Sequence, residues 1–284
     1  MPNRTWFITG ISGGFGRLMT EQLLERGDRV AGTARKLEAV DDLKSRYQDQ
    51  LWVSSLDLTD PPAIHRVVNA AFAAFSHRID VIVNNAGYGL IGAVEELSEE
   101  QITHQINTNL LGSILVVRAA LPHLRAQGSG RILQISSMGG QIAFPGLSLY
   151  HTTKWAVEGF FESTAQDIAP FNIQSTLVEP GGARTGFFSS GSTAYGQALP
   201  EYANTPAGAA RKRIEGGSYV PPGDPAKMVR AIISSVDEEN APKRLVLGGD
   251  AYTMIHEALT ERLARLEAQK DLAFSTDFST STVE

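Results

Sequence analysis

Residues 5–16 of this 284-residue chain read TWFITGISGGFG. The first five are apolar or β-branched, which is typical of a buried strand, and from Phe15 onward an apolar spacing indicates a helix. Glycines crowd the turn between them. Such a turn suits a dinucleotide, because a side chain would hold a pyrophosphate away from the backbone and free N–H groups at a helix start favour its charge. The residues expected to hold the diphosphate are Gly10, Ser12, Gly13, Gly14, Phe15 and Gly16.

Short apolar runs continue to alternate with amphipathic segments up to about residue 180. Strands are expected at residues 5–9, 29–33, 51–56, 80–84, 131–135, 173–178 and 245–247. Asp60 before two prolines, and Ser98 three residues before Gln101, are helix-start signals. Strands that alternate with helices pair in parallel through right-handed crossovers. The sequence therefore predicts an α/β fold, a three-layer doubly wound sandwich with about seven parallel strands.

The composition excludes several classes of protein. Hydrophobic residues make up 42% and charged residues 20%, which argues against a mostly disordered chain. The formal net charge is -6 and no basic cluster is present, so no nucleic-acid partner is expected. The chain contains no cysteine, which excludes disulfides and thiolate zinc sites, and no metal site is expected. Neither a membrane span nor a signal peptide is evident, so we expect a cytoplasmic protein.

One domain is expected over residues 1–270, with two irregular regions. Residues 182–225 are rich in Gly, Pro, Ser and aromatic residues and weakly periodic, which is typical of a substrate lid. Residues 271–284 are expected to be a polar tail. A helix over about 250–270 has one apolar stripe, which favours packing against the domain itself. The stripe consists of Ile255, Leu259, Leu263 and Leu266.

The end of the second strand indicates which dinucleotide is bound. An NAD-preferring protein places an acid there to bind the ribose hydroxyls, but here Ala34 occupies that position and Arg35 follows. A guanidinium can pair with a 2′-phosphate, so we expect NADP(H) in preference to NAD(H); a solvated loop arginine is the alternative. Asp57 and Leu58, after the third strand, are candidates for the adenine pocket, although Asp57 fits a turn residue equally well.

Polar residues from several segments are expected to meet at the carboxyl edge of the sheet, where a parallel sheet presents its ligand crevice. Tyr150 and Lys154 lie one turn apart on one helix face, and Ser137 ends the fifth strand. Asn85, Ala86 and Gly87 follow the fourth strand. Asn109 lies inside a long predicted helix, an unfavourable place for an asparagine.

Taken together, these residues resemble the classical short-chain dehydrogenase/reductase (SDR) family, which has a Rossmann-type fold. The matching motifs are Gly10, Gly14 and Gly16, Asn84 to Gly87, Asn109, Ser137, Tyr150 with Lys154, and Pro180-Gly181 followed by Thr185. They cover about residues 5 to 190. The resemblance implies an NADP(H)-dependent oxidoreductase that interconverts a carbonyl and a secondary alcohol. Many NADP-preferring members carry a basic residue where this chain has Gly13, so Arg35 would act alone.

The resemblance also implies a role for each matching residue. Tyr150 would be the general acid/base, and Lys154 would favour its ionised form and bind the nicotinamide ribose. Ser137 would orient the substrate oxygen, and Asn109 would hold a water that links Lys154 to solvent. Thr185 would bind the cofactor near its carboxamide or diphosphate, and Pro180 and Gly181 would also contact the cofactor.

The substrate is expected to be hydrophobic, similar to the steroids and retinoids on which some family members act. The residues expected to touch it are Met138, Gln141, Phe144, Phe187 and Phe188. Arg184 is the one basic residue considered for an acidic substrate group, and His151 is expected to be non-catalytic. The helices that contain residues 98–121 and Tyr150 would form a homodimer or homotetramer interface.

Two other functions use the same scaffold. An SDR-type epimerase or dehydratase would use a different glycine spacing. A non-catalytic NADPH-binding sensor would be expected to lack Tyr150 or Lys154, and both are present.

Overall fold

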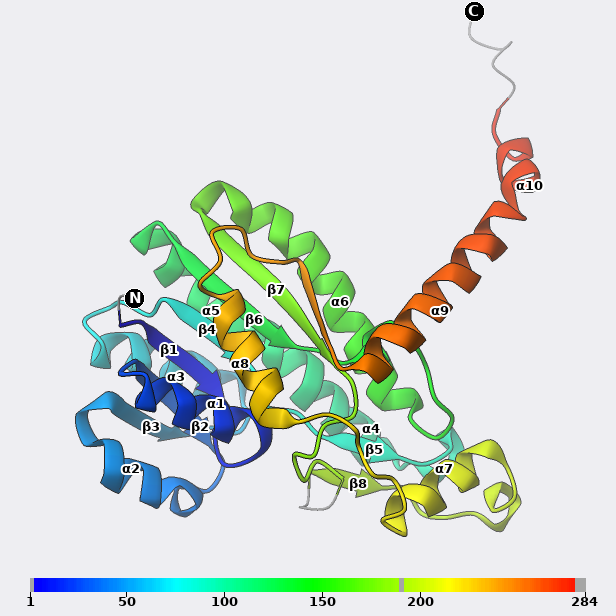
Figure 1. Cartoon of the computed structure of the whole chain (residues 1–284), viewed down its shortest axis with the longest axis horizontal. Coiled ribbons are helices and arrows are strands. Elements are labelled where there is room, and N and C mark those ends of the chain that lie inside the picture. The colour runs from blue at the N-terminus through cyan, green and yellow to red at the C-terminus, as the bar shows by residue number, and fades with distance from the viewer. Residues whose placement is uncertain (1–2, 189–191, 279–284) are drawn as a thin grey trace, which may run out of the picture.

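The computed structural model describes residues 3–188 and 192–278. These contain a seven-stranded parallel sheet of order β3-β2-β1-β4-β6-β7-β9, with helices on both faces (Figure 1). The strands are β1 (Thr5–Thr9), β2 (Arg29–Ala34), β3 (Leu51–Ser55), β4 (Val81–Asn84), β6 (Gly130–Ile135), β7 (Ile173–Pro180) and β9 (Arg244–Leu247). The predicted strands and the doubly wound α/β class are confirmed, with strand ends shifted by one or two residues.

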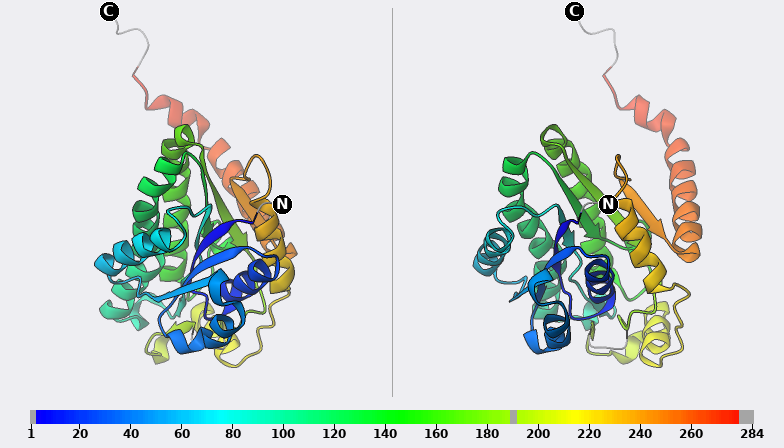
Figure 2. Two further views of the ribbon diagram at one scale, coloured as in Figure 1. Left: turned by 90° about the vertical axis from the view of Figure 1, so that its left-hand side faces the viewer. Right: turned by 60° about the vertical axis from the view of Figure 1, so that its left-hand side comes forward.

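Side chains that alternate along β1 divide the helices between the two faces. Phe7 packs with α3 (Pro61–Ala74), α5 (Gly112–Gln127) and α6 (Ser148–Ile168). Trp6 and Ile8 pack instead with α1 (Gly14–Glu25), α2 (Asp41–Tyr47) and α8 (Pro225–Ser235). The views in Figure 2 show these two helix layers from the side. Because the strands are covered on both faces, they read as continuous apolar runs rather than as alternating ones.

The predicted helix starts are confirmed, but one long helix contains an irregular turn. Asp60 accepts a hydrogen bond from the Ala63 N–H (3.1 Å), and Ser98 and Gln101 form a capping box. After Ser98 the chain forms α4 (Glu99–Ile106), a π-helical turn (Asn107–Leu111) and then α5. π-helical turns are rare and frequently lie at functional sites.

The predicted lid has its own small structure. Its strand β8 (Thr193–Tyr195) pairs with β5 (Gly89–Ile91), and α7 (Pro206–Glu215) follows. In Figure 1 this region lies below the sheet, beside the carboxyl ends of the strands. Residues 189–191 of the predicted lid and 279–284 of the predicted tail lie outside the described residues.

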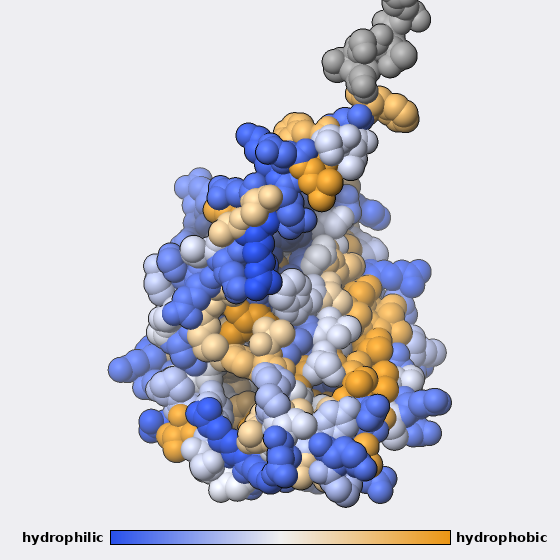
Figure 3. Space-filling model, turned by 90° about the vertical axis from the view of Figure 1, so that its right-hand side faces the viewer, coloured by the Kyte–Doolittle hydropathy of each residue, from blue (hydrophilic) through white to orange (hydrophobic). Residues whose placement is uncertain are grey.

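The last helices project from the body of the protein (Figures 1 and 2). In α9 (Gly249–Glu267), Ile255 is buried, whereas Leu259, Leu263 and Leu266 are 48%, 56% and 67% exposed. The expectation that this whole stripe packs against the domain is therefore wrong beyond Ile255. A further helix, α10 (Lys270–Ser275), occupies the start of the predicted tail. Figure 3 shows apolar residues among hydrophilic ones on these projecting helices.

None of the helices in the described part of the chain combines the length and the apolar character needed to cross a bilayer.

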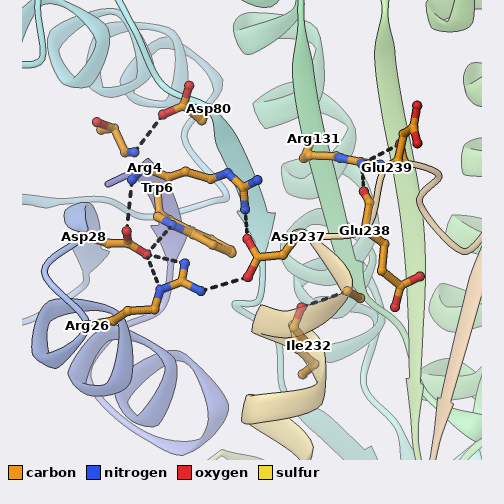
Figure 4. A network of polar contacts seen from close by, with 12 residues as sticks. Arg4, Trp6, Arg26, Asp28, Asp80, Arg131, Ile232, Asp237, Glu238 and Glu239 are labelled. Carbon is orange, nitrogen blue, oxygen red and sulfur yellow. Dashed lines mark hydrogen bonds and ion pairs between the residues drawn. The ribbon is translucent and has the colours of Figure 1, made fainter. Parts of the chain in front are cut away.

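A polar network ties the amino-terminal edge of the sheet together (Figure 4). The carboxylate of Asp28, which is 2% exposed, accepts hydrogen bonds from the Arg4 N–H (2.9 Å), Trp6 Nε1 (3.2 Å) and Arg26 Nε (2.9 Å). Arg4 and Arg26 also form ion pairs with Asp237, just after α8. The network therefore joins β1, the α1–β2 turn and the end of α8 at the edge opposite the glycine turn.

We predict that Asp28→Ala lowers the free energy of unfolding by roughly 2–4 kcal/mol, because it leaves the buried Trp6 indole N–H and the Arg4 backbone N–H without their acceptor and removes one of the two carboxylate partners of Arg26. Urea unfolding measures the change. Asp42→Ala is the matched control. It removes the ion pair between Arg17 and Asp42, and because the Asp42 side chain is 63% exposed, the substitution should change the free energy of unfolding little. Equal losses in both variants would contradict the prediction.

Candidate active site

A cavity of about 1000 Å³ opens at the carboxyl ends of the parallel strands. The predicted cofactor and catalytic residues that line it are Gly10, Ser12, Gly13, Gly14, Phe15, Arg35, Asp57, Leu58, Asn85, Ala86, Gly87, Ser137, Tyr150, Lys154, Pro180, Gly181 and Thr185. Met138, Phe144, Phe187 and Phe188 from the predicted substrate contacts also line it. Gly16, Asn109 and Gln141 do not. The topology explains the convergence, because parallel strands present the loops that follow them at one edge.

The glycine turn leaves bare backbone at one end of this cavity. Gly10 has a φ of +75° and Gly14 a φ of +54°, which side chains of L-residues rarely adopt. A Cβ on Gly16 would lie 2.2 Å from the Gly10 carbonyl oxygen, so only glycine allows α1 to approach β1 this closely. The N-cap of α1 is Gly13, which has no side chain to accept the first helical N–H groups. This cradle fits the diphosphate of a dinucleotide.

Asn85 holds the end of β4 against the glycine turn. Its Nδ2 donates to the carbonyl oxygens of Thr9 (2.9 Å) and Gly10 (3.1 Å). The Thr9 hydroxyl in turn accepts hydrogen bonds from the backbone N–H groups of Asn85 and Ala86. Asn85 thus holds the glycine turn, which follows β1, against the end of the neighbouring strand β4.

Arg35 lies where the cofactor preference is predicted to be decided, and Asp57 lies where the adenine pocket is predicted. Arg35 is exposed at the cavity and has no ion pair among the described residues. The Asp57 carboxylate accepts hydrogen bonds from the Thr59 N–H and hydroxyl, both at 2.8 Å, and these bonds lower the pKa of Asp57. Asp57 is therefore a turn residue and lines the cavity as well. Arg17, also near the turn, is held by Glu21 and Asp42.

The structure brings Ser137, Tyr150 and Lys154 together. Lys154 is 8% exposed, and its ammonium donates to the Ile135 carbonyl oxygen (2.8 Å) and lies 5.6 Å from the centre of the Tyr150 ring. Burial lowers the pKa of Lys154 to about 8, and the charge of Glu158 opposes this. Burial raises the pKa of the Tyr150 phenol, partly offset by its hydrogen bond with Ser137. At neutral pH the lysine is therefore mainly charged and the phenol is protonated.

Asn109 lies behind these groups, in the π-helical turn. Its side chain accepts a hydrogen bond from the Tyr88 N–H (3.1 Å) and donates to the Tyr88 carbonyl oxygen (2.9 Å) and the Thr153 hydroxyl (3.3 Å). Thr153 is the neighbour of Lys154 on α6. Among the described contacts, Asn109 thus reaches the helix of Lys154 but not the ammonium itself.

His151 fastens the loop after Ser137 to α6. Its Nε2 accepts a hydrogen bond from the Phe144 N–H (2.9 Å), so Nδ1 carries the proton and donates to the Gly139 carbonyl oxygen (2.9 Å). Burial lowers the pKa of this imidazole, which favours the neutral ring that both bonds require. This anchoring role was not predicted, because the path of the loop cannot be read from the spacing of Gly139, Phe144 and His151.

A buried ionic network lies beneath the site and corrects one prediction. Arg244 Nε donates to Glu158 (3.1 Å) and Glu179 (3.0 Å), and the Ser136 hydroxyl donates to Glu158. The amide of Gln141 also donates to Glu179 (3.1 Å). Gln141 therefore faces this network, and the expectation that it contacts the substrate in the cavity is wrong. Burial, together with the nearby Glu179 carboxylate, raises the pKa of Glu158 to about 7.

Several lining residues of the lid were also missed, among them one cation and one tyrosine. Arg213 on α7 and Tyr219 after it line the cavity, whereas Arg184, the basic residue considered for this role, donates to the Pro221 carbonyl oxygen and does not line it. The sequence alone does not indicate which face of α7, and therefore which of its cations, is turned toward the cavity.

We predict that Glu158→Gln flattens the pH dependence of stability. The carboxyl binds its proton more tightly in the folded protein than in the unfolded chain. Its contribution to the free energy of unfolding therefore falls as the pH rises from 4.5 to about 7. Glutamine keeps the volume and cannot titrate. Urea unfolding across this range should show a smaller loss of stability in the variant than in the wild type.

The matched control is Glu162→Gln, which removes another carboxylate partner of Arg244, one that is 59% exposed. It should keep the wild-type slope. A wild-type slope in Glu158→Gln would show that another group titrates.

Comparison with known proteins shows likeness along nearly the whole chain. The sequence model of the short chain dehydrogenase family matches residues 4–195. Oxidoreductase BOA17 of Botryotinia fuckeliana is 37% identical over 273 residues, which cover 96% of this chain and 98% of that protein. A short-chain dehydrogenase from Streptomyces avermitilis superposes with a TM-score of 0.90 at 40% identity, covering 98% of this chain and 100% of the other. ElxO with NADP bound superposes with a TM-score of 0.73 at 26% identity, covering 89% of this chain and 100% of the other.

Proposed function

Because this chain belongs to the short-chain dehydrogenase family, we propose that it is an NADP(H)-dependent oxidoreductase that interconverts a carbonyl and a secondary alcohol on a hydrophobic substrate. The observation that carries the proposal is that one cavity contains the glycine turn, Arg35, Ser137, Tyr150 and Lys154. The bare glycine cradle fits the diphosphate. The cofactor, when bound, supplies or accepts the hydride.

In this proposal Tyr150 is the proton donor for carbonyl reduction. Its raised pKa keeps the phenol protonated, and Ser137 holds the substrate oxygen beside it by a second hydrogen bond. The Lys154 charge favours departure of the proton, because a nearby cation stabilises the phenolate that is left. In the oxidation direction the same phenolate accepts the proton of the alcohol. Lys154 is also placed to bind the nicotinamide ribose, and the water held by Asn109 stays a prediction.

We predict that Tyr150→Phe lowers turnover at least about a thousandfold, because the proton donor is lost, while NADPH binding is kept. Turnover is followed by NADPH absorbance with a panel of carbonyl compounds, and binding by NADPH fluorescence. Tyr252→Phe, at a 65% exposed position on α9, is the control and should keep full activity. Retained turnover in Tyr150→Phe would refute the assigned role.

The proposed preference for NADP(H) depends on Arg35. Ala34 at the end of β2 is 3% exposed and offers no carboxylate to repel a 2′-phosphate, and the Arg35 guanidinium is free to bind one. The NADP bound to ElxO is consistent with such a preference.

We predict that Arg35→Ala raises KM for NADPH about tenfold and leaves KM for NADH unchanged, because only NADPH carries the phosphate. Lys36→Ala is the control: Lys36 is the neighbouring exposed cation, and it does not line the cavity. An unchanged NADPH preference in Arg35→Ala would contradict the assignment.

We also propose that the protein forms an oligomer. Leu111 and Trp155 are 40% and 43% exposed on the two helices that would form the interface, which supports a homodimer or homotetramer. By contrast, Phe161 is buried in its own chain.

A single domain up to residue 270 and a cytoplasmic location stay predictions. The alternatives are an epimerase or a dehydratase, which would use a different glycine spacing, and a non-catalytic sensor, which would be expected to lack Tyr150 or Lys154.

A further inference from the structure

Beyond Tyr150 the cavity continues between residues 137–147 and the lid. The described side chains that line this part are mainly apolar. Arg213 on α7 is the one formally charged side chain that residues 137–147 and the described residues of 182–225 contribute to the lining. In an apolar cavity, a few polar groups decide the orientation and the identity of the ligand. The position of this one guanidinium therefore bears on the substrate.

Within the described residues, Arg213 differs from its neighbours on α7 in that its side chain has neither an ion pair nor a hydrogen bond. Arg211 forms an ion pair with Glu215 (2.9 Å), and Lys212 donates to the Ala203 carbonyl oxygen (2.9 Å). Within the described residues Arg213 has no ion pair, and its guanidinium carbon lies 5.0 Å from the centre of the Tyr219 ring. A guanidinium that lies over a ring keeps N–H groups along its edge for another acceptor.

A line of aromatic rings joins Tyr150 to this guanidinium. The ring centres of Tyr150 and Phe187 are 6.0 Å apart, those of Phe187 and Phe188 are 5.2 Å apart, and those of Phe188 and Tyr219 are 5.4 Å apart. All four side chains line the cavity. A substrate that reacts at Tyr150 and extends along these rings would have an apolar body and would end beside Arg213.

We propose that Arg213 binds a carboxylate at the end of the substrate remote from its carbonyl, so that the substrate class is an elongated, apolar oxo acid or hydroxy acid. This rests on the proposed function, because it assumes that the carbonyl reacts at Tyr150. A carboxylate accepts two parallel hydrogen bonds from the edge of a guanidinium. The charge of Arg213 would also draw an anion into this mainly apolar part of the cavity.

The test compares acids with their neutral esters. The probes are phenyl ketones that carry a carboxylate at the end of alkyl chains of increasing length, each with its methyl ester. We expect kcat/KM with NADPH to be about tenfold higher for the acid than for the ester at the chain length that spans the cavity. Arg213→Met should abolish this preference, so that kcat/KM for the acid falls to the level of the ester. Lys212→Met, which removes a neighbouring cation from the same helix, should keep it.

Thermal shift with NADP⁺ bound gives a measurement that does not need turnover. The acid should stabilise the wild type and Lys212→Met more than the ester does, and should lose this advantage in Arg213→Met. Equal effects of acid and ester on the wild type would overturn the proposal. A higher KM for NADPH in Arg213→Met would also overturn it, because Arg213 would then bind the cofactor phosphates. Acid-specific stabilisation without turnover of any ketone would refute the proposed function and support the carboxylate site.

Discussion

The hydrogen bond from the Lys154 ammonium to the Ile135 carbonyl oxygen fixes the geometry of the site. A buried ammonium without an acceptor is very unfavourable, so this bond sets the height and rotation of α6 against β6. Tyr150, one turn earlier, is thereby brought to Ser137, two residues beyond Ile135. Glu158, one turn later, opposes the effect of burial on the pKa of Lys154, which is about 8. The lysine is consequently both a structural anchor and a cation at neutral pH.

The proposed reacting groups and the proposed substrate contacts lie on different parts of the fold. The glycine turn and Ser137 follow β1 and β6 of the rigid sheet, and α6 is held against that sheet by Lys154. Phe187 and Arg213 belong to the lid, whose strand β8 pairs with β5 and not with the seven-stranded sheet. Loops on a rigid scaffold can change substrate preference without disturbing the reacting groups, because few core contacts cross between the two. His151 is an intermediate case, since it ties a loop that lines the cavity to α6, the helix that contains Tyr150.

Much of the fold and of the central site could be predicted from local patterns. Seven strands, the caps at Asp60 and Ser98, and the glycine turn each depend on a short stretch of chain. Tyr150 and Lys154 are neighbours through helix geometry alone. The carboxyl-edge rule for parallel sheets then brings Ser137 to the same edge without knowledge of any tertiary contact. These features were predictable because propensity, periodicity and strand order are already present in the sequence.

Only the tertiary structure decided which side of the loop Gln141 faces, which buried carboxylates share Arg244, and which cation of α7 reaches the cavity. It also decided that α9 leaves the body after Ile255, although its apolar stripe continues. Each of these depends on the path of a loop or on the direction of one helix relative to another. Such choices are made by packing between residues distant in the sequence, and local patterns contain no signal for them.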